Sequence, residues 1–444
     1  MSWSPPQRPE SVRSILAGEV ELLAEEAALP LVRDTLVAEA AASQGLTLRS
    51  PSDFDACLGH PDFEAAAALE NLEAFLAALA LEAELNPIGQ ILTRRFLLRL
   101  LQVRIQIMRH LRADPGTLDE EIRAPLFVAG APRTGTTILH ALLAADPAHR
   151  VPEAWELLFP VPPPAPGSVS PNTKGDPFLG DARIDLANRE LVRPQTLVSG
   201  LLSIHEYGGR KPKECLSSMS FAFESEEFTA RYAVPSFAKR LAQSDMSEAY
   251  KMHRLVLQIR QRAQTETAWV LKSPVHLHVL PTLLKFYPDA RIAITHRDPV
   301  TLLASLTNLI ANLRWAHSDR VDPAAIAEEH IERYAGTFDR LVDWKERDAL
   351  PESQIHHSHF ADFQTEPLAT VERLYVRFEK DMGSEAKVAM QKVLDANPAD
   401  RHGTHRYSRD SVAEDPSALR TRFARYQETF AVPSDDTSLL QADR

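Results

Sequence analysis

The segment PLFVAGAPRTGTTILHALLAADP, residues 125–147, constrains the fold of this chain more than any other stretch. It begins with a short apolar run, passes through a loop that contains Gly130 and Gly135, and continues into an apolar pattern typical of a helix. Backbone N–H groups at the start of such a helix bind phosphate groups. The segment therefore predicts a buried strand, a P-loop-like turn and a helix that begins near Thr136.

The position of the cation separates this loop from the loops of nucleotide-hydrolysing proteins. Those loops carry a lysine directly after the second glycine. Here GAPRTGTT has Thr136 at that position and Arg133 before the glycine. Arg133 still offers a fixed charge and a bidentate set of donors. The loop is predicted to hold a phosphate other than the γ-phosphate of ATP, the alternative being an ordinary glycine-containing turn.

Three later apolar runs are each followed by a helical pattern, within residues 267–274, 290–299 and 353–363. Strands that alternate with helices indicate a parallel sheet flanked by helices, and ligands bind at the carboxyl ends of such strands. Ser305 lies about two turns into the helix predicted to follow Arg297, where both side chains are able to grip one phosphate. Polar residues stand at all four strand ends, namely Arg133, Lys272, Arg297 and Asp362.

Residues 1–122 are predicted to form an all-helical N-terminal extension, with helical patterns over 11–28, 62–85 and 86–113. The last pattern carries six arginines. They are predicted to form a solvated face, with the alternative that some reach toward a bound anion. The proline-rich segment 159–177 is either a surface linker or a wall of the site.

The whole-chain composition excludes several classes of protein. The formal net charge is −12 and no long basic run is present, so nucleic acid is not an expected partner. No apolar run reaches the roughly 18 residues that a transmembrane helix needs, and the first residues do not resemble a secretory signal. With only Cys57 and Cys215 as cysteines, a cytoplasmic location is predicted. No Cys or spaced carboxylate completes a metal site with His356–His359, so no metal is expected.

Taken together, GAPRTGTT, LKSPVHL, HRDPVTLLASL and SHFADFQTEPLATVERLY resemble the sulfotransferases that use 3′-phosphoadenosine 5′-phosphosulfate (PAPS). The resemblance is greatest to a bacterial branch with a helical N-terminal extension and a WEL…PPP segment. PRTGTT is also similar, more distantly, to the tyrosylprotein sulfotransferases. The resemblance implies a helical extension over 1–122, a P-loop-like α/β domain over 123–410 and a C-terminal tail over 411–444.

The resemblance also implies roles for individual residues. PAPS is the implied co-substrate, Arg297 and Ser305 match the pair that binds its 3′-phosphate, and Lys272 matches a lysine that steadies the transferred group. The residues that match the loop around the 5′-phosphosulfate are Arg133, Thr134, Gly135, Thr136 and Thr137. The segment RHGTHRYS resembles one that closes over the nucleotide, which implies contacts from His405, Arg406 and Tyr407.

Sulfuryl transfer needs a base to take the proton of the acceptor hydroxyl. In several branches of the family this base is a glutamate shortly after the P-loop helix. The distance from the loop fits Glu153 slightly better, but the WEL pattern points to Glu156, which is the expected base. Because other branches use a histidine, His276 and His205 are alternatives. The acceptor is expected to be a small molecule, lipid or glycan.

Two other classes of function stay open. A P-loop kinase or NTPase is disfavoured by the missing lysine after Gly135 and by the lack of a convincing magnesium-binding carboxylate at a strand end. A non-catalytic nucleotide-binding relative is disfavoured because Arg133, Lys272, Arg297 and Ser305 are all present. Stabilisation by ATP with magnesium, rather than by adenosine 3′,5′-bisphosphate, would indicate the kinase.

Overall fold

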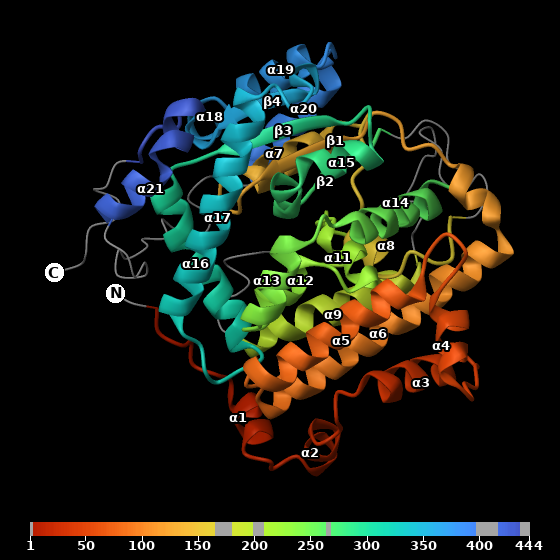
Figure 1. Ribbon diagram of the computed structural model, residues 1–444. Helices are drawn as coiled ribbons and strands as arrows, with labels where there is room; N and C mark the ends of the chain where they lie inside the picture. Colours follow the sequence, from red (N-terminus) through yellow and green to blue (C-terminus); the bar gives the residue numbers. More distant parts are fainter. Residues whose placement is uncertain (1–2, 165–179, 199–207, 263–267, 397–415, 436–444) are drawn as a thin grey trace.

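A computed structural model describes residues 3–164, 180–198, 208–262, 268–396 and 416–435. It contains a four-stranded parallel sheet with the order β2-β1-β3-β4, which lies in the upper part of the view in Figure 1. The strands are β1 (Leu126–Gly130), β2 (Val270–Lys272), β3 (Arg291–His296) and β4 (Ile355–His359). Each lies within one of the four predicted runs, and the predicted α/β fold with a parallel sheet flanked by helices is confirmed. The chain passes from β1 outward to β2 and then back across β1 to β3, and ligands bind at such a reversal of strand order.

Both faces of the sheet are buried, which explains why its strands are continuous apolar runs. Side chains along β1 alternate between two cores: Leu126 and Val128 face one, Phe127 and Ala129 the other. α7 (Thr136–Ala145), α19 (Pro367–Arg377) and α20 (Ser384–Ala396) cover the first face. α14 (Ser247–Gln261), α15 (Leu280–Phe286), α16 (Pro299–Trp315), α17 (Pro323–Glu346) and α21 (Pro416–Thr429) pack against the second.

The N-terminal region is helical, as predicted. Its helices are α1 (Glu10–Leu16), α2 (Glu21–Ala27), α3 (Arg33–Ser43), α4 (Pro51–Leu58), α5 (Ala65–Glu82) and α6 (Pro87–Ala113). The predicted helix over 11–28 is broken into α1 and α2 at Gly18, whose φ is +75°. Phe75 of α5 stacks on Phe228 with ring centroids 4.5 Å apart, so these helices share a core with the segment between β1 and β2. The domain boundary at residue 122 stays a prediction.

Three of the six arginines on α6 do not lie on a solvated face, so that prediction is wrong for them. Arg94, Arg99 and Arg104 are buried. Arg104 donates to the carbonyl oxygens of Leu58 and Phe221 at 2.9 and 2.8 Å, and burial lowers its pKa to about 10. Such buried donors hold α6 against its neighbours, because each hydrogen bond gives a buried carbonyl oxygen the partner that it needs.

The remaining elements connect and surround these layers. They are η1 (Pro115–Asp119), α8 (Ala154–Leu158), α9 (Ala182–Leu197), α11 (Leu216–Met219), η2 (Ser220–Ala222), α12 (Glu226–Arg231), α13 (Pro235–Gln243), η3 (Pro274–His278), η4 (Glu352–Gln354) and α18 (Phe360–Thr365). Over the ranges described, no helix combines the length and apolar character needed to cross a bilayer.

Candidate active site

The loop between β1 and α7 has the strand–loop–helix geometry that its sequence predicted. β1 ends at Gly130 and α7 begins at Thr136, with Gly135 as N-cap at φ +95°. Arg133 also has a positive φ, +71°. A left-handed conformation is costly for a residue other than glycine, and such strain gathers at functional sites. Thr136 is buried under the loop, whereas Thr137 is exposed at the start of α7.

A pair of threonine hydroxyls supports the loop from below. Thr134 Oγ1 lies 2.6 Å from Thr295 Oγ1 of β3 and donates to the carbonyl oxygen of Ala131 at 2.6 Å. Gly130 leaves the room for Thr295, because a methyl group at Gly130 would overlap the Thr295 hydroxyl. The position of the loop is therefore set by the close packing of β1 against β3.

Gly130→Ala is expected to lower the free energy of unfolding by about 1–3 kcal/mol, since it overpacks a site that cannot relax. The matched control is Gly336→Ala in the middle of α17. A methyl group there meets only the Arg340 side chain, at 3.7 Å. That change is expected to stabilise by about 0.5–1 kcal/mol. Urea denaturation of both variants measures the difference, and equal stabilities would contradict the packing account.

Arg133, Ser305 and Arg297 come together above the sheet although they lie on different elements. Arg133 Nε donates to Ser305 Oγ at 3.0 Å. Arg297 Nη1 donates to the carbonyl oxygen of Arg133 at 2.9 Å. The Arg297 guanidinium also lies over the ring of Phe360, 4.0 Å from its centroid. Two guanidinium groups thus meet the N-terminal end of α7, and this arrangement suits a ligand with more than one anionic group.

Lys272 forms another edge of the site. It ends β2, is 4% exposed, and makes an ion pair with Glu214. The chain is fixed there because the N–H of Cys215 donates to the carbonyl oxygen of Lys272 at 3.0 Å. Sequence reasoning did not identify Glu214. Asp362, the polar residue after β4, instead lies 3.7 Å from Arg373.

The two candidate glutamates have different surroundings. Glu156 is buried between Arg150 and Arg260, at 2.6 and 3.0 Å, and accepts the N–H of Glu153 at 3.0 Å. Burial by itself would raise the pKa of Glu156, but Arg150 and Arg260 outweigh it and hold that pKa below its ordinary value. A charged, fully enclosed carboxylate of this kind is a weak proton acceptor.

Glu153 is more accessible, and its backbone lies beside the segment that leads to Glu214. Its side chain is 27% exposed, accepts the indole N–H of Trp155 at 2.6 Å, and lies 3.4 Å from Arg210. The backbone of Glu153 forms a bridge with Pro212, two residues before Glu214. Glu153 is therefore linked to Lys272 through this segment, whose Glu214 makes the ion pair with Lys272.

The other candidates fall in the core or outside the described residues. His276 is fully buried, and its Nδ1 lies 2.7 Å from the hydroxyl of Tyr250. Burial holds the pKa of His276 well below its ordinary value, and its ring packs edge-on against Phe127 at 4.8 Å. These contacts place the His276 side chain in the core of the protein. The remaining candidates, His205, His405, Arg406 and Tyr407, lie outside the described residues.

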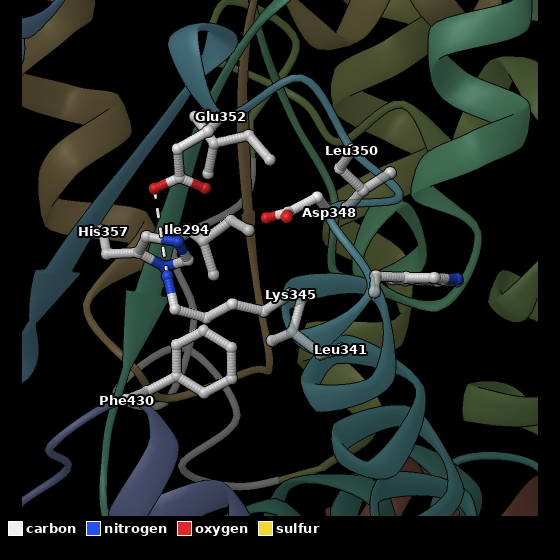
Figure 2. A pocket seen from close by; sticks show the side chains of 10 residues that line it. Ile294, Leu341, Lys345, Asp348, Leu350, Glu352, His357 and Phe430 are labelled. Atoms are coloured by element: carbon white, nitrogen blue, oxygen red, sulfur yellow. Dashed lines mark ion pairs between the residues drawn. The ribbon is translucent and has the colours of Figure 1, made fainter.

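His357 and His359 of β4 form hydrogen bonds with other protein groups. His357 Nδ1 lies 2.8 Å from His296 Nε2, and His359 Nε2 donates to the carbonyl oxygen of Phe430 at 2.8 Å. Figure 2 shows His357 and Phe430 in a small pocket, with Lys345 extended toward Glu352 at 3.9 Å. In the part of the chain that the structure covers, no cluster of three or more potential metal ligands occurs.

Comparison with known proteins identifies the class. The model of the Sulfotransferase family matches residues 125–384, which include the loop, both arginines and Lys272. The chain belongs to this family, so the family predicted from the motifs is confirmed.

Individual relatives agree with this result. The structure of sulfotransferase STF1 from Mycobacterium tuberculosis H37Rv is 27% identical, with a TM-score of 0.72 over 88% of this chain and 98% of that one. Sulfotransferase STF9 from Mycobacterium avium, at 24% identity, shares the fold with a TM-score of 0.75 over 90% and 97% of the chains. Omega-hydroxy-beta-dihydromenaquinone-9 sulfotransferase Stf3 of Mycobacterium bovis is 23% identical over 56% of this chain, and the match spans 61% of that relative's length.

Proposed function

We propose that the chain transfers the sulfuryl group of PAPS to an acceptor hydroxyl. The observation that carries this proposal is the meeting of Arg133, Ser305 and Arg297 at the N-terminal end of α7. The loop Arg133–Thr137 would hold the 5′-phosphosulfate against the helix N-terminus. Arg297 and Ser305 would hold the 3′-phosphate. Two anionic groups on one nucleotide match two arginines, Arg133 and Arg297, which follow the neighbouring strands β1 and β3.

The reaction breaks the bond between sulfur and the 5′-phosphate oxygen and forms a bond between sulfur and the acceptor oxygen. The products are adenosine 3′,5′-bisphosphate and a sulfate ester. Lys272, held at the end of β2 by Glu214, is placed to stabilise negative charge on the sulfuryl and leaving oxygens. Most of the catalysis is then positioning and charge stabilisation by fixed groups.

We assign the base to Glu153, which takes the acceptor proton as the new bond forms. Its partial exposure and its pairing with the segment that carries Glu214, the partner of Lys272, support this assignment. This assignment departs from the sequence pattern, which favours Glu156. The two arginines beside Glu156 favour a structural role, because they outweigh the effect of burial, hold the pKa of Glu156 below its ordinary value and so weaken it as a proton acceptor.

The acceptor is proposed to be an apolar molecule with a terminal hydroxyl. Support comes from the printed name of the mycobacterial relative, which specifies a hydroxylated menaquinone derivative. The start of the proline-rich segment is also fixed near the site. The carbonyl oxygens of Pro160 and Pro162 accept from Arg260, the partner of Glu156, at 3.3 and 3.2 Å. This contact supports the alternative in which the proline-rich segment forms a wall of the site, rather than a surface linker.

Arg297→Ala tests the donor site through thermal unfolding with adenosine 3′,5′-bisphosphate. At roughly 100 times its dissociation constant, the nucleotide is expected to stabilise the wild type by about 2.7 kcal/mol. Arg297→Ala should lose most of this stabilisation by the nucleotide. Arg240→Ala, which removes an exposed arginine paired with Glu70 on another part of the surface, should retain it.

Two results would contradict the proposal. Stabilisation by ATP with magnesium, but not by the bisphosphate, would indicate a kinase or NTPase. Bisphosphate binding without any sulfuryl transfer from labelled PAPS to hydroxylated acceptors would indicate a non-catalytic relative.

A further inference from the structure

Arg297 already holds a carboxylate from the C-terminal segment. Its Nε donates to Oδ2 of Asp435 at 3.1 Å, and the two side chains are 17% and 26% exposed. Carboxylate and phosphate are oxyanions that arginine binds through the same planar set of donors. Asp435 is therefore a direct competitor for a phosphate that approaches this edge of Arg297.

Further contacts hold the segment in this place. The N–H of Asp435 donates to Oδ2 of Asp298 at 2.9 Å. Arg420 of α21 donates to the same carboxylate at 3.2 Å and to Oγ of Ser434 at 2.7 Å. Asp298 is fully buried and also caps α16, so it is a rigid anchor next to Arg297. Ser434, Asp435 and Arg420 are called the C-terminal latch below.

The chain that leads to the latch is anchored as well. Phe430, which follows α21 and lines the pocket in Figure 2, stacks on His296 with ring centroids 4.9 Å apart. Its carbonyl oxygen accepts from His359, as described above. His296 directly precedes Arg297, so this anchor and the latch lie at the same strand end. A short tether between two fixed points brings the Asp435 carboxylate to Arg297 with little loss of conformational entropy.

We propose that the C-terminal latch competes with the 3′-phosphate of the donor nucleotide for Arg297 and must open before that phosphate binds. This proposal rests on the proposed function, in which Arg297 holds the 3′-phosphate. A phosphate and Asp435 on one guanidinium would repel each other at close range. Because the ion pair is partly exposed, opening it costs little. The latch therefore lowers the affinity for nucleotides that carry a 3′-phosphate without closing the site.

The test compares adenosine 3′,5′-bisphosphate with adenosine 5′-phosphate by calorimetry on the full chain. Asp435→Asn is expected to tighten binding of the bisphosphate about two- to fivefold, the range measured for exposed ion pairs, and to leave the monophosphate unchanged. Arg420→Gln loosens the latch without altering Arg297 and should act in the same direction. Glu428→Gln removes an exposed charge from α21 and serves as the control, with neither affinity changed.

The possible results separate the latch from the donor site. Weaker binding of the bisphosphate to Asp435→Asn would mean that Asp435 orients Arg297 for the nucleotide. Equal binding in the wild type and both latch variants would mean that the contact has no energetic effect. Either result overturns the proposal. If the proposed function is wrong, the wild type itself fails to bind the bisphosphate.

Discussion

Replacing Glu156 with glutamine is expected to lower the free energy of unfolding by about 3–5 kcal/mol, the cost of breaking a buried ion pair by removing one partner. Glutamine keeps the size of the side chain but deprives Arg150 and Arg260 of the carboxylate that they share. The side chain of Arg260 is fully buried, so water cannot replace the lost partner. Urea denaturation at neutral pH measures the change.

The stability contributed by Glu156 also depends on pH. Its folded pKa lies below its ordinary value of 4.5, so the contribution is complete above pH 4.5 and is lost as the pH falls through the folded pKa. The wild type is therefore expected to lose stability more steeply than Glu156→Gln below about pH 4.5. A variant that keeps wild-type stability but loses turnover would instead place Glu156 in the reaction.

The sheet, and the meeting of Arg133, Ser305 and Arg297 at its edge, were predictable because they depend on short-range patterns. Each apolar run predicted one strand, and the polar residues at the ends of three of the strands, Arg133, Lys272 and Arg297, mark the candidate site, whereas Asp362 after β4 pairs with Arg373. The carboxyl ends of parallel strands meet at one edge, so Arg133, Lys272 and Arg297 were expected to lie near each other. Ser305 followed from helical periodicity alone, two turns after the start of α16.

The partners of the charged residues were not predictable, because they depend on contacts between distant segments. Glu156 meets Arg260 across 104 positions, and Lys272 meets Glu214 across 58. The WEL pattern identified the helix that carries Glu156 but not the buried arginine behind it. The arginines of α6 show the same limit, since a pattern of charges does not reveal which of them find buried acceptors.

These distant contacts change how the two glutamates are interpreted. They stand three positions apart at the start of α8, where the N–H of Glu153 donates to the carboxylate of Glu156. Glu156 therefore holds the backbone from which Glu153 projects. If Glu156 fixes the geometry and Glu153 accepts the proton, as proposed above, the same substitution has opposite effects at the two positions.

Glu153→Gln is expected to lower kcat by about 10²–10⁴-fold, the usual contribution of a general base, while stability changes by less than about 1 kcal/mol. The amide oxygen of glutamine can still accept the Trp155 N–H, so the local structure is retained. Thermal unfolding with adenosine 3′,5′-bisphosphate should show unchanged donor binding. Turnover is measured with labelled PAPS and a hydroxylated apolar acceptor.

The pH profile distinguishes a base from a residue that only positions another group. With Glu153 as base, the wild-type rate should rise with pH as the carboxyl loses its proton, and this limb should be absent in Glu153→Gln. A positioning role would lower the rate at every pH and leave the limb in place. If the variant retains both the rate and the limb, Glu153 is not the base. His205 would then be the next residue to test, because a histidine limb would appear at higher pH than a carboxylate limb.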